Sequence, residues 1–111
     1  MDFKLLILLG CAMLFFGGAN MVLISSHENA HKQIFAGYGV GSEIEYGLFG
    51  AKTVADGEDW IELSAEDRRL VSALNALNEV FGYQTLAIFN CLAVFSVFVV
   101  MAFKMMEEDE E

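Results

Sequence analysis

Two long apolar blocks dominate the pattern of hydrophobic and polar positions along the chain. The first runs from Leu5 to Ile24 and the second from Thr85 to Phe103, and neither contains a charged residue. An α-helix needs about 20 apolar residues to cross roughly 30 Å of hydrocarbon. We therefore predict an all-α membrane protein, a two-pass transmembrane helical hairpin with a glycine-rich ordered loop and a long second helix that projects from the membrane.

Polar residues beside the blocks divide the chain further. Ser25 and Glu28 form an S-x-x-E capping pattern, so the first helix either breaks at Ser25 and restarts, or simply continues. Ser64, with acidic residues two and three positions later, is typical of the start of a second helix. The predicted segments are a first transmembrane helix (1–25), a short juxtamembrane helix (26–35), a glycine-rich loop (36–63), a long helix (64–104, with its span at about 85–103) and an acidic tail (105–111).

The segment between the two helices is rich in glycine. Residues 36–63 contain six glycines and show no helical period. This composition predicts an irregular but ordered loop. The pair Asp56–Gly57, between KTVA and EDWI, is a candidate turn for a small β-hairpin.

Composition and charge narrow the class of protein. The chain has 111 residues, of which 56% are hydrophobic, a mean hydropathy of +0.48 and no proline, which is too apolar for an ordinary soluble domain of this size. Sixteen acidic residues against six basic ones give a net charge of −10. Such a charge argues against nucleic acid as a partner and against adhesion to anionic lipid. The apolar blocks make the lipid bilayer and other integral membrane subunits the expected partners.

Few charges bear on orientation and location. Lys4 and Lys104 flank the blocks on the terminal side, whereas Lys32 is the only basic residue close to the membrane on the loop side. Termini in the cytosol or matrix are therefore expected, in the mitochondrial inner membrane or another energy-transducing membrane, where small two-pass subunits are common. A cleaved signal peptide, or a lipobox ending at Cys11, is the rival interpretation of the first block, which we expect to be retained as a span.

Small and amide residues within the blocks predict how the helices pack. Gly10, Gly17 and Gly18 make the first helix thin, so that another backbone can approach closely. Asn20 and Asn90 are the only amides within the blocks. Antiparallel counting places them at similar depths, and a hydrogen bond between them would be worth about 0.6–2 kcal/mol.

The second helix also carries a leucine stripe outside the membrane. Leu70, Leu74, Leu77 and Phe81 recur at heptad spacing, which is the pattern of a helix that packs against a partner. Packing on the chain's own loop is the alternative. We expect another subunit, because the hairpin offers few other large apolar residues outside the membrane.

Residues 27–31 carry the sharpest chemical pattern, H-E-x-x-H. In this pattern, which resembles that of zinc metalloproteases, two histidines one helical turn apart bind zinc and the glutamate is the general base. Counting outward from the membrane at 1.5 Å per residue brings Glu79 to the height of His27 and His31, which makes it the candidate third ligand. Glu28 and His31 also form the E-x-x-H of di-iron helical bundles, so zinc and iron are the metals to consider.

Several observations weigh against catalysis. The similarity covers five residues, and the sequence shows no substrate cleft or oxyanion stabiliser. We therefore expect the pattern to be a fortuitous polar cap at headgroup level, and the protein not to be an enzyme. The expected function is a non-catalytic accessory or assembly subunit of a larger membrane complex. The alternatives are a self-assembling homo-oligomeric hairpin, as in a small channel or a virion or sheath component, and a metal-binding membrane protein.

Overall fold

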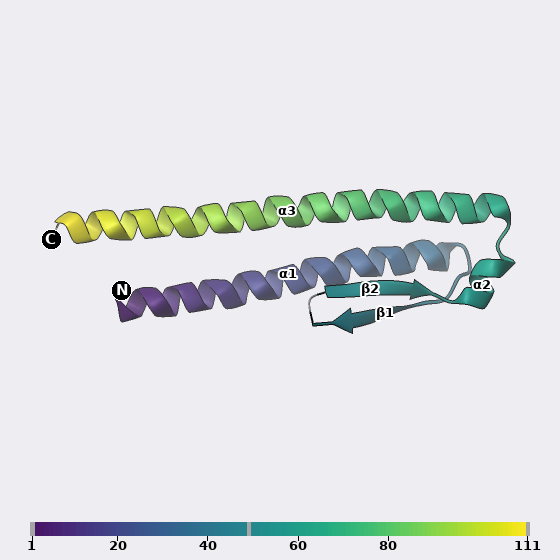
Figure 1. The fold of residues 1–111 in the computed structure, drawn as a ribbon, viewed down its shortest axis with the longest axis horizontal. Helices are drawn as coiled ribbons and strands as arrows, with labels where there is room; N and C mark the ends of the chain where they lie inside the picture. Colours follow the sequence, from purple (N-terminus) through teal and green to yellow (C-terminus); the bar gives the residue numbers. More distant parts are fainter. Residues whose placement is uncertain (1, 49, 111) are drawn as a thin grey trace.

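Two long antiparallel helices with a small β-hairpin beside them make up the molecule (Figure 1). The computed structural model describes residues 2–48 and 50–110. Its elements, in chain order, are α1 (Phe3–Gly37), β1 (Ser42–Gly47), β2 (Gly50–Ala55), α2 (Gly57–Glu62) and α3 (Ala65–Glu110). The molecule measures 71 × 21 × 16 Å, and α3 alone accounts for its length at 1.5 Å per residue.

The helix α1 is continuous past Ser25, so the capping pattern there does not interrupt it. Asp2 caps its beginning, where the side chain accepts a hydrogen bond from the Lys4 N–H at 3.3 Å. The helix ends at Gly37, and Gly39 follows with a φ of 75°, a conformation that favours glycine. This turn lets the Val40 N–H bond the Phe35 carbonyl at 2.9 Å and buries the Val40 side chain.

The helix α3 begins where the sequence indicates but extends further than expected. The Ser64 hydroxyl accepts a hydrogen bond from the Asp67 N–H at 3.0 Å, as an N-cap residue does. The helix does not end at residue 104 but continues to Glu110, through most of the predicted tail. Lys104 supports this extension, since its Nζ lies 3.2 Å from the Glu107 carboxylate one turn later.

The segment expected to be an irregular loop instead contains a β-hairpin and a short helix, so the all-α expectation was wrong for this part of the chain. The strands β1 and β2 pair antiparallel, with Ser42 opposite Ala55 and Gly47 opposite Gly50. The predicted turn at Asp56–Gly57 was also wrong. Asp56 instead caps α2, because its carboxylate accepts the Asp59 N–H at 3.0 Å.

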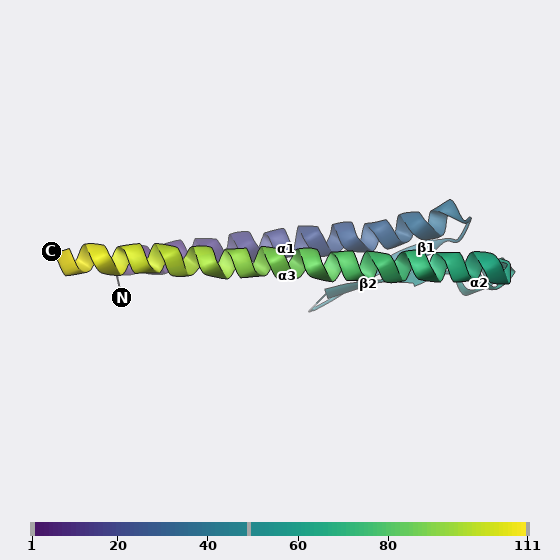
Figure 2. The same cartoon turned by 90° about the horizontal axis from the view of Figure 1, so that it is seen from above.

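The hairpin packs against the half of α1 that lies farther from the termini (Figure 1). Figure 2, the view from above, shows α3 in front of α1, with the two helices at a shallow angle to each other. Among the described residues, only Val40, Val71 and Ala93 are buried apolar residues. Both α1 and α3 are long and apolar enough to cross a membrane, by length and composition. Their many exposed large apolar side chains are what helix surfaces facing lipid or other helices present.

Candidate metal centre

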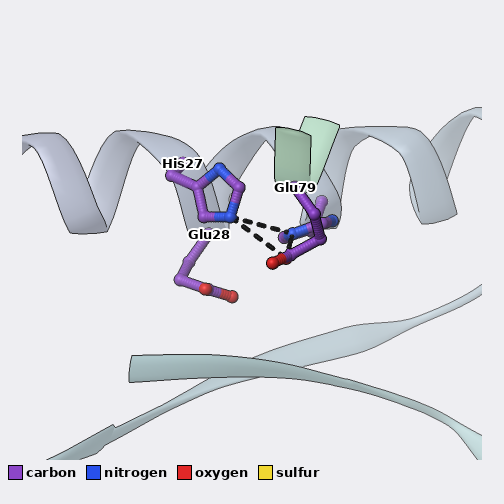
Figure 3. Close-up of side chains that lie close together, drawn as sticks. His27, Glu28 and Glu79 are labelled. Atoms are coloured by element: carbon purple, nitrogen blue, oxygen red, sulfur yellow. Dashed lines mark hydrogen bonds and ion pairs between the residues drawn. The ribbon is translucent and has the colours of Figure 1, made fainter. Parts of the chain in front are cut away.

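Three electron-rich atoms converge between α1 and α3. His27 and His31 lie one turn apart on α1 and point to Glu79 on α3. His27 Nε2 lies 3.1 Å from Glu79 Oε1 and 3.2 Å from His31 Nε2, and His31 Nε2 also contacts Glu79 Oε1. Figure 3 shows His27 and Glu79 reaching towards each other from the two helices. The structure thus brings together the three residues that the sequence proposes as metal ligands.

The two distances from His27 Nε2 fit a tetrahedral metal ion. Ligand atoms about 2.0–2.1 Å from a tetrahedral centre are separated by about 3.3–3.4 Å. The separations of 3.1 and 3.2 Å that involve His27 Nε2 are close to that value. Two imidazoles and one carboxylate form the donor set of catalytic zinc sites and also of non-haem iron sites.

Asn75 fixes the tautomer of His31 that such a centre requires. The Asn75 side-chain oxygen lies 2.6 Å from His31 Nδ1, and an amide oxygen only accepts, so Nδ1 carries the proton. The neutral ring then presents a lone pair at Nε2, the atom that faces Glu79. Metal-binding histidines typically donate their other ring N–H to an oxygen acceptor in this way.

Gly82 makes room for the His27 ring. A Cβ added at Gly82 would lie 2.1 Å from His27 Nδ1 and 2.4 Å from Cε1, so only glycine lets the imidazole lie against α3 here. Asn78 holds the same point of α1, because its amide donates to the His27 backbone carbonyl at 3.2 Å. The Nδ1 atom of His27 is buried and has no hydrogen-bond partner among the described residues. Close helix contact therefore directs the Nε2 atom of His27 towards Glu79.

Glu28 lies beside the three candidate ligands but is held from another direction. Its side chain is buried, and its carboxylate accepts a hydrogen bond from the Thr53 hydroxyl on β2 at 2.6 Å. One carboxylate oxygen still lies within 4.8 Å of the ligand atoms of His27, His31 and Glu79. Figure 3 shows Glu28 directed towards the hairpin, away from the line between His27 and Glu79. Glu28 is therefore near enough to the other three residues either to bind the same metal ion or to act beside it.

The electrostatics of Glu79 favour its ionised form. In the metal-free protein, partial burial raises the pKa of this carboxyl, but hydrogen bonds from His31 and His27 and the charges of these rings, when both of their nitrogens carry protons, outweigh burial. The net effect is a pKa below the ordinary value for glutamate. An ionised carboxylate is the form that binds a metal ion.

An open cleft of about 560 Å³ adjoins this cluster. Glu28 and His31 of α1 line it, together with Glu79 of α3 and residues 51–53 of β2. Trp60 of α2 also lines it and contacts Phe35 edge to face, with ring centroids 6.2 Å apart. The sequence pattern did not reveal this cleft, because the hairpin forms one of its walls.

The other predicted contact residues are placed as follows. Asn20 and Asn90 exchange side-chain hydrogen bonds of 3.0 and 2.8 Å, and each amide also donates to the carbonyl four residues earlier. A Cβ at Gly10, Gly17 or Gly18 would meet nothing within 4 Å, so close packing there requires another molecule and stays a prediction. The four residues of the leucine stripe on α3 are 41–59% exposed: Leu70, Leu74, Leu77 and Phe81.

Two residues of the site, Gly82 and Thr53, were not predicted from the sequence. Gly82 left a signal, since it is a single glycine inside a long helix and lies one turn after Glu79. Thr53 left none, because its contact with Glu28 depends on how the hairpin packs on α1, across 25 residues of chain.

No protein-family model, curated protein or solved structure matches this chain. The fold and the cluster together define a helical hairpin with a candidate centre of two histidines and one carboxylate between its long helices.

Proposed function

We propose that this chain is a two-pass membrane metalloprotein that binds one zinc ion through His27, His31 and Glu79. The observation that carries the proposal is the triangle formed by His27 Nε2, His31 Nε2 and Glu79 Oε1, in which the two sides that meet at His27 Nε2 are near the edge length of a zinc tetrahedron. Without a metal ion, ring protons must separate these three acceptor atoms, and the arrangement also desolvates two imidazoles whose side chains are about 10% exposed.

The centre has the composition of a hydrolytic site. Three protein ligands leave the fourth position of a tetrahedral zinc open, which distinguishes catalytic zinc sites from structural ones. When bound there, zinc lowers the pKa of a coordinated water to about 7. Glu28 lies within 4.8 Å of the ligand atoms and opens on the cleft, so it is placed to accept a proton from that water. We propose metal-dependent hydrolysis as the function, with Glu28 as general base.

Metal content tests the first part of the proposal. The full chain, purified in mild detergent, should carry about one zinc per chain by elemental analysis, and His31→Ala should reduce this to background. The matched control is Lys32→Ala, the exposed next residue, which should keep the metal. Iron at one per chain would change the metal and favour redox chemistry, and equal metal in the wild type and His31→Ala would refute the site.

Glu28→Gln separates the base from a fourth ligand. Because the amide cannot accept a proton as the carboxylate does, a base would be lost while the three ligands stay intact. Zinc content should therefore remain at one per chain. Loss of zinc from this variant would show that Glu28 binds the metal and would contradict its role as base.

A second candidate function is supported by the exposed stripe on α3. We propose, as an alternative, a non-catalytic accessory or assembly subunit of a larger membrane complex, or a self-assembling hairpin, since Leu70, Leu74 and Leu77 stay 41–53% exposed in the described chain. Location in an energy-transducing membrane belongs to this alternative. Leu74→Glu should release co-purifying subunits, or reduce a homo-oligomer to a monomer, on size-exclusion chromatography in detergent. An unchanged elution profile would refute this role of the stripe.

A further inference from the structure

The free edge of β2 runs along the cleft beside the candidate metal centre. Ala51, Lys52 and Thr53 are consecutive residues of β2 and all three line the cleft. Side chains of consecutive strand residues point to opposite faces, so a cleft that touches all three follows the edge of the strand rather than one face.

The pairing register identifies which backbone groups this edge presents. The Asp56 N–H donates to the Gly41 carbonyl at 2.7 Å, so residues 41 and 56 form a hydrogen-bonded pair. Hydrogen-bonded and non-hydrogen-bonded pairs alternate in an antiparallel ladder. Thr53 and Ile44 therefore form a non-hydrogen-bonded pair, and so do Ala51 and Tyr46. The backbone N–H and C=O groups of Thr53 and Ala51 point away from β1.

These outward groups have the spacing of an extended peptide. Ala51 and Thr53 are two residues apart, about 6.6–6.8 Å along a strand. Their backbone groups have no backbone hydrogen-bond partner elsewhere in the described parts of the chain. An unpaired strand edge of this kind binds an extended chain as one more strand, through main-chain hydrogen bonds.

Thr53 connects this edge with the proposed base. Its side chain donates to the Glu28 carboxylate at 2.6 Å, whereas its backbone groups belong to the free edge. A chain that pairs with Thr53 is thereby held at a fixed offset from Glu28 and from the ligand atoms within 4.8 Å of it. The position is also close to the membrane surface, because His27 follows the end of the first apolar block by three residues.

We propose that the substrate is an extended peptide segment at the membrane surface, which pairs with the free edge of β2 at Ala51 and Thr53. This inference rests on the proposed hydrolytic zinc centre and makes the protein a peptidase. Water adds its oxygen to the scissile carbonyl carbon, and Glu28 accepts the proton that the water loses. Glu28 returns that proton to the amide nitrogen as the C–N bond breaks, and the products are a carboxylic acid and an amine.

Binding of hydroxamates to the zinc-loaded full chain in detergent tests the inference. Three probes are compared: acetohydroxamate, a short apolar peptide hydroxamate, and the same peptide with the backbone N–H groups that face β2 methylated. Edge pairing predicts that the peptide binds more tightly than acetohydroxamate, and that each methylation weakens binding by about 3- to 10-fold. Equal binding of the methylated and unmethylated peptides would refute edge pairing and leave the zinc centre standing. Absence of zinc, with no binding of acetohydroxamate, would instead refute the proposed function.

A pair of proline variants tests the protein side of the same contact. Ala51→Pro removes an outward N–H without removing a ladder hydrogen bond, and Tyr46→Pro does the same on the opposite edge, at the residue paired with Ala51. Ala51→Pro should lose about 3- to 10-fold in affinity for the peptide hydroxamate but keep its zinc, and Tyr46→Pro should bind like the wild type. Equal effects of the two variants would contradict the assignment of the β2 edge. The methylated peptides test the same contact in the wild-type chain, so the inference does not depend on either variant folding.

Discussion

Replacing Gly82 with alanine tests the candidate centre through a residue that touches no metal. The new Cβ would lie 2.1 Å from His27 Nδ1, which is 1.3 Å less than the 3.4 Å at which ordinary contact begins. The imidazole must therefore retreat by about an ångström, or the helices must separate there. Metal–ligand distances tolerate only about 0.2 Å, so either response withdraws His27 Nε2 from the triangle.

The size of the expected effect follows from the loss of one ligand in three. Loss of a residue that merely supports a ligand typically weakens metal binding about 10- to 100-fold. Displacement of the ligand itself should cost at least the upper end of that range. We therefore expect Gly82→Ala to bind zinc at least about 100-fold more weakly than the wild type.

Competition with a chromophoric chelator in detergent measures the affinity, and circular dichroism measures helix content. The matched control is Gly17→Ala on α1, where a Cβ meets nothing within 4 Å. Both changes favour helix formation by about 1 kcal/mol, so neither should reduce helicity. Wild-type zinc affinity in Gly82→Ala, with helix content unchanged, would show that His27 does not bind the metal in this geometry.

Three further predictions concern the contacts around the centre and within the apolar helices. Asn75→Ala should weaken zinc binding about 10- to 100-fold in the same competition assay, because His31 Nδ1 loses its acceptor, whereas Asn75→Asp should retain it. Because folding lowers the pKa of Glu79, its contribution to the stability of the metal-free protein is full above the ordinary carboxyl pKa and is lost as the pH falls through the folded-state value. Unfolding of Glu79→Gln should therefore depend less on pH between neutral and acidic conditions, and an identical pH dependence would contradict this. Finally, a double-mutant cycle on Asn20→Leu and Asn90→Leu should give a coupling of about 0.6–2 kcal/mol, and a coupling of zero would refute the amide pair as a contact that fixes the helix register.

Much of the helical architecture follows directly from sequence. Uncharged apolar blocks and capping residues are local signals, so both long helices were predicted, and α3 begins directly after Ser64 as that residue indicates. The hairpin was predicted at the wrong place, with its turn at Asp56–Gly57, because its strands are short and their burial depends on packing against α1. The local sequence was also ambiguous at Asp56, since Asp–Gly is typical both of a hairpin turn and of a helix start.

The triangle of His27, His31 and Glu79 could be predicted from sequence because a straight helix rises by a constant distance per residue. Residue number therefore gives the distance of each side chain from the end of its apolar block. Antiparallel counting from the ends of the apolar blocks brought Glu79 level with His27 and His31, and the structure places them in contact. The cleft was inaccessible to the same reasoning, since its third wall belongs to β2. Without that wall, Glu28 appears as a polar residue at the membrane surface rather than a buried carboxylate held by Thr53.

The distribution of buried residues is itself an argument for function. Three apolar residues are buried in the described part of the chain, Val40, Val71 and Ala93. Two ionisable residues, Glu28 and His31, are buried as well. Burial of ionisable groups costs free energy unless each is paired, and a fold with so small a core gains little with which to offset that cost. If the contact between the helices were purely structural, apolar residues in place of Glu28 and His31 would stabilise it more than these ionisable residues do. Polar groups that are held in a buried position against this preference are characteristic of functional sites, and here both belong to the cluster of potential metal ligands found among the described residues.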